Sequence, residues 1–210
     1  MTGTLVGYDP GGNRSHGLAL LAIVDGVPHA LEVTTCADVE VALRRVEKAG
    51  SLLGVGVDTL TCWSTGPSGW RPADRWLRAR YPPVQRSVAS PNTLYGSMSL
   101  SGMAFLLALR ARQPGLPVTE AHPKVLYHAL TGRRHAYAAE ARAMDTLAAN
   151  ALGVDVQTAN DHEWDAAASA LTALSMLRGT WALDLHKLLP ADGERIVMPA
   201  GPTAYAWPDD

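Results

Sequence analysis

The order of short apolar runs in the N-terminal third of this chain limits the folds that it can adopt. Three runs with strand character come first, then a helical stretch, then a fourth strand-like run. These segments are Leu5–Asp9, Gly17–Val24, Ala30–Thr34, Ala37–Lys48 and Leu52–Val57. Asp25-Gly26 is a hairpin signal, so we predict that the first three strands form an antiparallel meander. The fourth strand returns after a helix, so we expect it to be parallel to one of them.

The rest of the chain is predicted to alternate helices with single strands. The helices are Pro72–Arg80, Ser99–Arg112, Pro123–Leu130, Tyr137–Leu152 and a last one that ends at Arg178; the strands are Val118–Glu120 and Arg195–Met198. Asn160 and Glu163 have the spacing of a capping box, which marks the start of the last helix. Residues 59–98, punctuated by prolines, are the least regular part. No repeat or linker divides the chain, so we expect a single domain, 1–210.

Composition and charge exclude several classes of protein. Hydrophobic residues make up 47% of the 210 residues, so we expect a sizeable core. The formal net charge of −2 provides no global attraction for nucleic acid, and such binding would need a local basic patch. Cys36 and Cys62 show neither metal-site spacing nor a disulfide framework, which favours a reducing, cytoplasmic setting. No secretory signal and no apolar stretch of 18 residues is evident, so we expect no membrane partner.

Four acidic residues lie where a predicted element meets a loop. Asp9, Asp58 and Glu120 each end an apolar run, and Asp165 opens an alanine-rich helix. If the strands are neighbours in one sheet, these carboxylates converge on one edge, where they would bind Mg²⁺ or Mn²⁺.

Each acid also has a structural alternative. Asp9 precedes Pro-Gly in the turn-rich loop 10–16, a common position for a turn aspartate. Asp58 would cap a turn or helix, and Glu120 would form a salt bridge with an arginine. Asp165 would stabilise the positive end of its helix dipole.

Other polar residues suggest proton transfer and phosphate binding. His162 lies three residues before Asp165, where it would transfer a proton to or from the substrate or water. The alternative is a histidine that is simply exposed at the start of a helix. Arg71, Arg75 and Arg78 alternate with Trp70 and Trp76, a combination that suits contact with phosphates and stacking on bases. An amphipathic surface helix with one tryptophan in the core would give the same sequence.

Five segments resemble one family when they are taken in order. They are Val6-Gly7-Tyr8-Asp9, Gly56-Val57-Asp58, the stretch 71–78, Thr119-Glu120-Ala121-His122-Pro123-Lys124 and the stretch 164–173. The order of elements is that of the RNase H-like fold, and the segments resemble a family of predicted RNase H-like nucleases long carried as a domain of unknown function. Thr59-Leu60-Thr61 departs from the pattern, since the family usually has a proline after the second acid.

The resemblance implies an α/β fold and a metal-dependent activity. The fold would be a central mixed sheet of five strands, three antiparallel and then parallel, with helices on both faces. The activity would be hydrolysis of phosphodiester bonds by two Mg²⁺ or Mn²⁺ ions. Asp9 would bridge the ions, Asp58 and Asp165 would each bind one, and Glu120 would support the site.

Two other functions remain open from the sequence. One is an ATP-binding phosphotransferase of the sugar-kinase and actin kind, whose phosphate loops resemble Asp9-Pro10-Gly11-Gly12. The other is a binding protein that keeps the RNase H-like fold without catalysis. The choice among DNA, RNA and nucleotide substrates also remains open, as does the oligomeric state, with a dimer among the alternatives.

Overall fold

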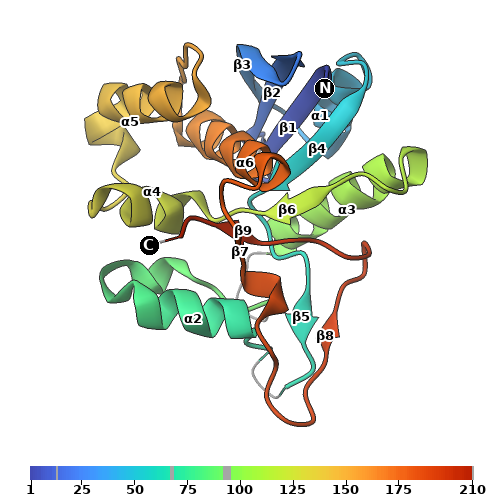
Figure 1. Cartoon of the computed structure of the whole chain (residues 1–210), viewed down its shortest axis with the longest axis vertical. Coiled ribbons are helices and arrows are strands. Elements are labelled where there is room, and N and C mark those ends of the chain that lie inside the picture. Colours follow the sequence, from blue (N-terminus) through green and yellow to red (C-terminus); the bar gives the residue numbers. More distant parts are fainter. Residues whose placement is uncertain (13, 67–68, 92–95, 210) are drawn as a thin grey trace.

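The computed structural model describes residues 1–12, 14–66, 69–91 and 96–209. Asn13 of the loop after Asp9 and parts of the irregular segment 59–98 therefore lie outside the described residues. Figure 1 shows a twisted sheet at the centre of the molecule, with helices packed around it and the C-terminal segment passing along one edge.

The central sheet has five strands in the order β3-β2-β1-β4-β6. β1 (Gly3–Asp9), β2 (His16–Val24) and β3 (Val27–Cys36) form the predicted antiparallel meander. β4 (Leu52–Val57) and β6 (Val118–Glu120) extend it in parallel with β1, so the predicted direction of the fourth strand is confirmed. The predicted architecture, a mixed sheet of three antiparallel and then parallel strands, is confirmed as well.

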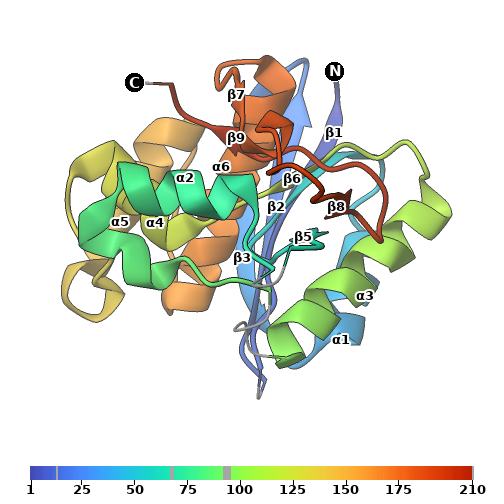
Figure 2. The same cartoon turned by 90° about the horizontal axis from the view of Figure 1, so that it is seen from below.

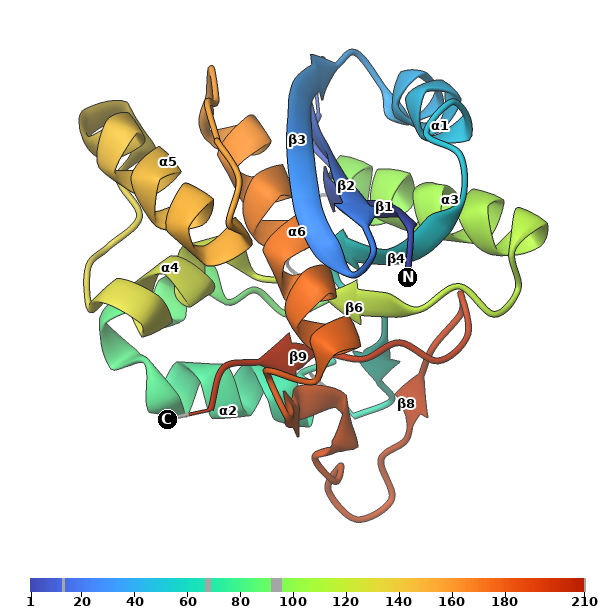
Figure 3. The ribbon, with the colours of Figure 1, turned by 45° about the horizontal axis from the view of Figure 1, so that its top comes forward.

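Helices cover both faces of this sheet (Figure 3). α1 (Val39–Glu47) and α3 (Gly96–Arg112) pack against one face, where their side chains enclose Val6 and Tyr8 of β1. α5 (Tyr137–Leu152) and α6 (Asp161–Arg178) pack against the other face, with Leu5 of β1. Because strand side chains alternate between faces, Gly7 and Asp9 share the α6 face with Leu5.

Three glycines bring α6 unusually close to the strands. A Cβ atom added to Gly7, Gly17 or Gly56 would lie only 1.9 Å from a backbone oxygen of α6. Those oxygens belong to Ala166, His162 and Ser169, respectively. Backbone therefore packs on backbone along the helix, which requires glycine on β1, β2 and β4. The small alanines of α6 complete this contact and are fully buried between α6 and the sheet.

The cap predicted for the last helix is present. The Asn160 side chain accepts a hydrogen bond from the Glu163 amide at 3.0 Å. The Glu163 carboxylate reaches back to the amide of Ala159, at 2.8 Å, one residue before the position that a capping box prescribes. The start of α6, and with it the position of Asp165, is fixed by this pair.

Shorter elements build the region beside β6 (Figure 2). They are β5 (Trp63–Ser64), α2 (Pro72–Arg80), the 3-10 helix η1 (Pro82–Ser87), α4 (Pro123–Thr131), β7 (Leu183–Asp184), the 3-10 helix η2 (Leu185–Lys187), β8 (Ile196–Val197) and β9 (Ala206–Trp207). β8 lies in the predicted strand Arg195–Met198, but it pairs with β5 and not with the central sheet.

The edge of β6 is covered by the C-terminal segment. Glu120 donates its amide to the carbonyl of Ala204 at 2.8 Å, and the Ala204 amide donates to Val118 at 2.9 Å. None of the helices in the described ranges is long and apolar enough to cross a membrane.

Helix starts differ slightly from the predicted ones. α1 begins at Val39 and not at Ala37, because the Asp38 carboxylate accepts a hydrogen bond from the Val41 amide at 2.7 Å and so acts as its cap. α3 begins at Gly96, three residues before the predicted start, since its first turn has no apolar periodicity to mark it.

Candidate functional site

Asp9 is the last residue of β1 and Asp58 directly follows the neighbouring parallel strand β4, and both lie on the same face of the sheet. Tyr8 of β1 is paired with Val57 of β4, and the Asp58 amide donates to the Tyr8 carbonyl at 2.9 Å. The two aspartates that come next in each strand are therefore neighbours on the side covered by α6. Asp9 is buried, with 2% of its surface exposed, whereas Asp58 is partly exposed and lines a cavity.

Asp165 reaches this edge from α6, on the second turn of the helix. Its carboxylate is buried, and Oδ1 lies 3.1 Å from Nε2 of His135. The close packing of α6 on Gly7 and Gly17 sets how near this carboxylate comes to the strand ends. The structure thus brings Asp9, Asp58 and Asp165 to one end of the sheet, as the predicted strand order requires.

His162 lies one turn before Asp165 and is hydrogen-bonded to Asp9. Its Nδ1 is 2.6 Å from Oδ2 of Asp9, and about a third of its side chain is exposed. The hydrogen bond to Asp9 raises the pKa of His162 despite the opposing effect of burial. Burial, and to a lesser degree the charge of Asp165, raises the pKa of Asp9 to about 6, although the bond to His162 opposes this. Because the two groups are hydrogen-bonded, the protonation of each depends on that of the other.

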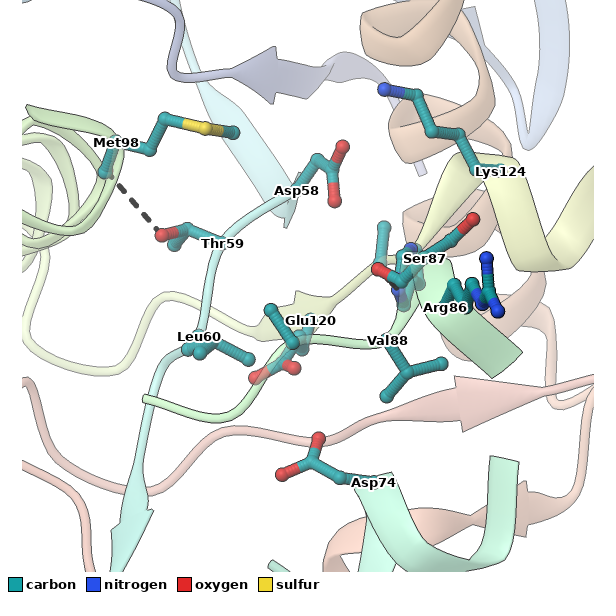
Figure 4. Close-up of a pocket in the computed structure, with 13 residues that line it drawn as sticks. Asp58, Thr59, Leu60, Asp74, Arg86, Ser87, Val88, Met98, Glu120 and Lys124 are labelled. Carbon is teal, nitrogen blue, oxygen red and sulfur yellow. Dashed lines mark hydrogen bonds between the residues drawn. The ribbon is translucent and has the colours of Figure 1, made fainter. Parts of the chain in front are cut away.

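Lys124 supplies a positive charge to the same group. Figure 4 shows its ammonium and the Asp58 carboxylate on the same side of the cavity. Burial and then the charges of Asp9 and Asp165 raise the pKa of Asp58 well above its usual value. Burial disfavours the charge of Lys124, but the attraction of Asp165, Asp58 and Asp9 outweighs it and raises the pKa of this lysine. Three carboxylates thus repel one another in a partly buried site, the situation that a divalent cation relieves.

The carboxylates of Asp9, Asp58 and Asp165 lie further apart than the ligand atoms of one compact metal site. Asp9, Asp58 and Asp165 are not a set whose ligand atoms all lie within 4.8 Å of one another in the described part of the chain. Oxygen ligands lie about 2.0–2.6 Å from Mg²⁺ or Ca²⁺, so a compact trio would be expected around a single ion. The charges of Asp9 and Asp165 both act on Asp58, and the charge of Asp165 acts on Asp9, so the three carboxylates interact as one group.

Glu120 lines the same cavity as Asp58, but its carboxylate is held by other partners. Val57 is paired with Glu120 in the β4–β6 register, so the glutamate side chain projects from the opposite face to Asp58. Its two oxygens accept hydrogen bonds from Arg71 at 2.7 Å each, and Oε2 also accepts from the amide and hydroxyl of Thr61 at 2.9 and 3.0 Å. Burial alone would raise the pKa of Glu120, but Arg71 and His186 hold it well below its usual value.

The three arginines predicted to bind substrate point elsewhere. Arg71 is buried, with 1% of its surface exposed, and is also paired with Asp74 at 2.6 Å. Arg75 lies 3.5 Å from Glu194. Arg78 donates to the Gln85 carbonyl at 2.8 Å, and its guanidinium lies over the Trp70 ring, 5.0 Å from the centroid. Their contacts therefore tie α2 to η1, to Trp70 and to the C-terminal segment.

A second group of metal-ligand types surrounds Glu120. Cys62, Glu120 and His186 bring one ligand atom each within 4.8 Å of one another. Oε2 of Glu120 already accepts three hydrogen bonds, and Nη1 of Arg71 lies 3.4 Å from the Cys62 sulfur. Because a guanidinium occupies the side where an ion would bind, this group is an ion-pair network and not a vacant ligand set.

A set of cations near the acids had only a weak sequence signal. Arg86 of η1, Lys124 of α4 and Arg134 after α4 line one cavity together with His135 and Asp161. Lys124 lies in a segment that resembles the nuclease family, and Arg133-Arg134 is a basic pair. Their grouping depends on how η1 and α4 pack, which the sequence does not display.

Comparisons with known proteins match some solved structures but no family. No family model matches the chain, and no curated protein matches it. Among solved structures, the Thermus thermophilus RuvC structure is 20% identical over 84% of this chain and 97% of that chain, with a TM-score of 0.40. T. thermophilus RuvC in complex with Holliday junction substrate is 19% identical over 85% and 97% of the two chains, with a TM-score of 0.39.

Proposed function

We propose that this protein is a divalent-metal-dependent nuclease that hydrolyses phosphodiester bonds of nucleic acid. The observation that carries the proposal is the meeting of Asp9, Asp58 and Asp165 at one end of the sheet with His162 bonded to Asp9. Bound Mg²⁺ or Mn²⁺ would activate the attacking water and stabilise the charge of the departing oxygen. Asp9 would bridge two ions, and Asp58 and Asp165 would each bind one.

The remaining residues have supporting roles in this proposal. His162, oriented by Asp9, accepts a proton from the attacking water or returns one to the leaving oxygen. Lys124 attracts the phosphate to the acid edge, because its ammonium faces the same space as Asp58. Glu120 holds Arg71 and Thr61 and thereby fixes the walls beside the site, a structural role in place of the catalytic one expected from sequence.

The test is cleavage of labelled DNA and RNA strands with Mn²⁺ or Mg²⁺. Asp9→Asn and Asp165→Asn should abolish cleavage, and Asp155→Asn, an exposed and isosteric change away from the site, should not. Circular dichroism must show that the variants remain folded. Equal cleavage by wild type and both site variants would contradict the mechanism.

The alternatives predict other outcomes of the same set of measurements. Thermal stabilisation by ATP with Mg²⁺, but not by Mn²⁺ alone, would support a phosphotransferase. Absence of any divalent-metal binding would support a protein that keeps the fold without the chemistry.

A further inference from the structure

A small cavity opens directly beside Asp58 (Figure 4). Its volume is about 280 Å³, at the lower end of ligand pockets and suited to a single ring system. Leu60, Val88 and Met98 supply much of its apolar surface, and Lys124 and Asp58 lie at its polar side. Glu120 and Asp74 also line it, and both carboxylates are paired with Arg71. A cavity of this kind excludes water from a flat apolar group and keeps one charged edge.

The cavity also contains a hydrogen-bonding group with no protein partner. His122 lines it, and Nε2 of this ring is 3.1 Å from the Ser87 carbonyl, so Nε2 carries the proton that it donates. Nδ1 is then an acceptor, and it is buried without a hydrogen-bond partner in the described part of the chain. Burial lowers the pKa of His122, which keeps the ring neutral. A buried acceptor without a partner is costly, so a ligand with an N–H edge would satisfy it.

A larger cavity of about 730 Å³ continues from the small one. The two share Arg86, Ser87 and Lys124, and the larger one adds Arg134 and His135. Arg86, Lys124 and Arg134 are exposed cations, and for Arg86 and Arg134 the described residues provide no ion-pair partner. Exposed cations along one wall are suited to successive phosphates of a nucleic-acid strand.

We propose that the small cavity holds one unpaired nucleobase, while Arg86, Lys124 and Arg134 bind the phosphates beside it. A base within a duplex is stacked and paired and cannot enter a closed apolar cavity, whereas an unpaired base can. The substrate class is therefore single-stranded nucleic acid, or an unpaired nucleotide in a branched or damaged one. This inference rests on the proposed nuclease function and names the substrate of the same site.

The test measures binding of a labelled single-stranded DNA oligomer, a blunt duplex of equal length and an abasic oligomer. Binding is measured in EDTA and again with Ca²⁺, and the variants are Met98→Trp, which fills the cavity, and Arg86→Ala with Arg134→Ala. Leu100→Trp is the matched control, because Leu100 is on the same helix and 74% exposed. Arg44→Ala is the control for loss of an exposed arginine far from the cavity.

The single strand should bind about tenfold or more tightly than the duplex, equivalent to about 1.4 kcal/mol. Met98→Trp should weaken single-strand binding about tenfold and leave abasic binding unchanged. Removal of Arg86 and Arg134 should weaken both oligomers and reduce the salt dependence of single-strand binding by about 1.4 in log–log slope.

Several binding results would overturn the inference. They are equal binding of duplex and single strand, equal effects of Met98→Trp and Leu100→Trp, and equal weakening of normal and abasic oligomers by Met98→Trp. Absence of binding in both EDTA and Ca²⁺ would also overturn it. Cleavage of duplex alone would leave the proposed nuclease function standing while removing this inference. Binding of single strands without cleavage in any metal would contradict the proposed nuclease function and leave the nucleobase cavity standing.

Discussion

His162 Nδ1 lies 2.6 Å from Asp9 Oδ2, which joins the start of α6 to the end of β1. The bond fixes the imidazole orientation and leaves Nε2 to exchange a proton with water or substrate. His162→Ala should therefore lower kcat roughly 10²- to 10⁴-fold, the usual contribution of general acid–base catalysis. Mn²⁺ affinity should fall by no more than about 10- to 100-fold, the usual contribution of an outer-shell partner, and added imidazole should restore part of the rate.

His29→Ala is the control for this change, because His29 is an exposed residue of β3. Steady-state kinetics with a fluorescent oligonucleotide would give kcat and KM separately. A His162→Ala enzyme as fast as the His29→Ala enzyme would show that His162 takes no part in proton transfer.

The raised pKa of Asp9 makes stability without metal depend on pH. A carboxyl whose folded pKa, about 6, exceeds its ordinary value of 3.8 binds more protons in the folded state between these values. Its contribution therefore favours folding at low pH and is lost as pH rises through the folded pKa. Asp9→Asn removes this titration. In EDTA, the free energy of unfolding of the variant should therefore rise relative to that of wild type by up to roughly 3 kcal/mol between pH 4 and 8.

Urea unfolding at several pH values measures this difference directly. Burial lowers the pKa values of His16 and His122, so their contributions to stability change with pH in the direction opposite to that of Asp9. Both histidines are present in wild type and variant, so these contributions cancel when the two free energies of unfolding are compared at each pH. A constant difference in the free energy of unfolding between pH 4 and 8 would mean that Asp9 has an ordinary pKa.

The glycine contacts under α6 should be sensitive to one added methyl group. Gly17→Ala would place a Cβ 1.9 Å from the His162 oxygen, so the helix start and His162 must shift. Overpacking of this kind costs roughly 1–3 kcal/mol, and activity should fall as well, since His162 moves. Thermal unfolding and cleavage assays would measure both effects.

Gly115→Ala is the matched control, because nothing lies within 4 Å of the added Cβ. Its stability should be unchanged or slightly higher. If Gly17→Ala unfolds at the same temperature as Gly115→Ala and cleaves normally, then α6 is not positioned by backbone contact with β2.

Variants of the arginine partners test whether Glu120 has a structural role or is a metal ligand. Arg71→Met leaves a buried carboxylate without its partner and should lower the free energy of unfolding by roughly 3–5 kcal/mol. Arg75→Met breaks an ion pair whose arginine is about half exposed. This change should alter the free energy of unfolding by no more than about 1 kcal/mol. Denaturant unfolding compares the two variants.

Glu120→Gln completes this comparison. It should destabilise the protein while leaving its affinity for Mn²⁺ unchanged, because Arg71 and Thr61 already hold the Glu120 carboxylate. A selective loss of Mn²⁺ binding in folded Glu120→Gln would return this residue to the ligand set.

Local sequence signals predicted most of the fold, because strands, helices and caps are determined by nearby residues. The hairpin at Asp25-Gly26 and the Asn160 cap are examples, and both precede elements that the structure contains. The strand order then followed from the order of elements. Asp9, Asp58 and Asp165 could be named from sequence because each lies at an element end that this order places on one edge.

Glu120 and Arg71 show what the sequence did not reveal. The face of the sheet from which Glu120 projects depends on the pairing register of β4 and β6, because a shift of one residue would move its side chain to the other face. These two strands are separated by about sixty residues of chain, so local sequence does not set their register. Arg71 has the sequence context of a surface arginine, yet Asp74 and Glu120 hold it in the interior. The cations Arg86, Lys124 and Arg134 meet only through the packing of η1 on α4, a long-range contact.

The most direct test of the central claim is calorimetric titration of Mn²⁺ into wild type, Asp58→Asn and Asp165→Asn at neutral pH. Wild type should bind Mn²⁺, and each variant should lose more than about 100-fold in affinity, since even an outer-shell partner contributes roughly 10- to 100-fold. Absence of Mn²⁺ binding by folded wild type, or equal affinity in all three proteins, would contradict a metal site built from these carboxylates.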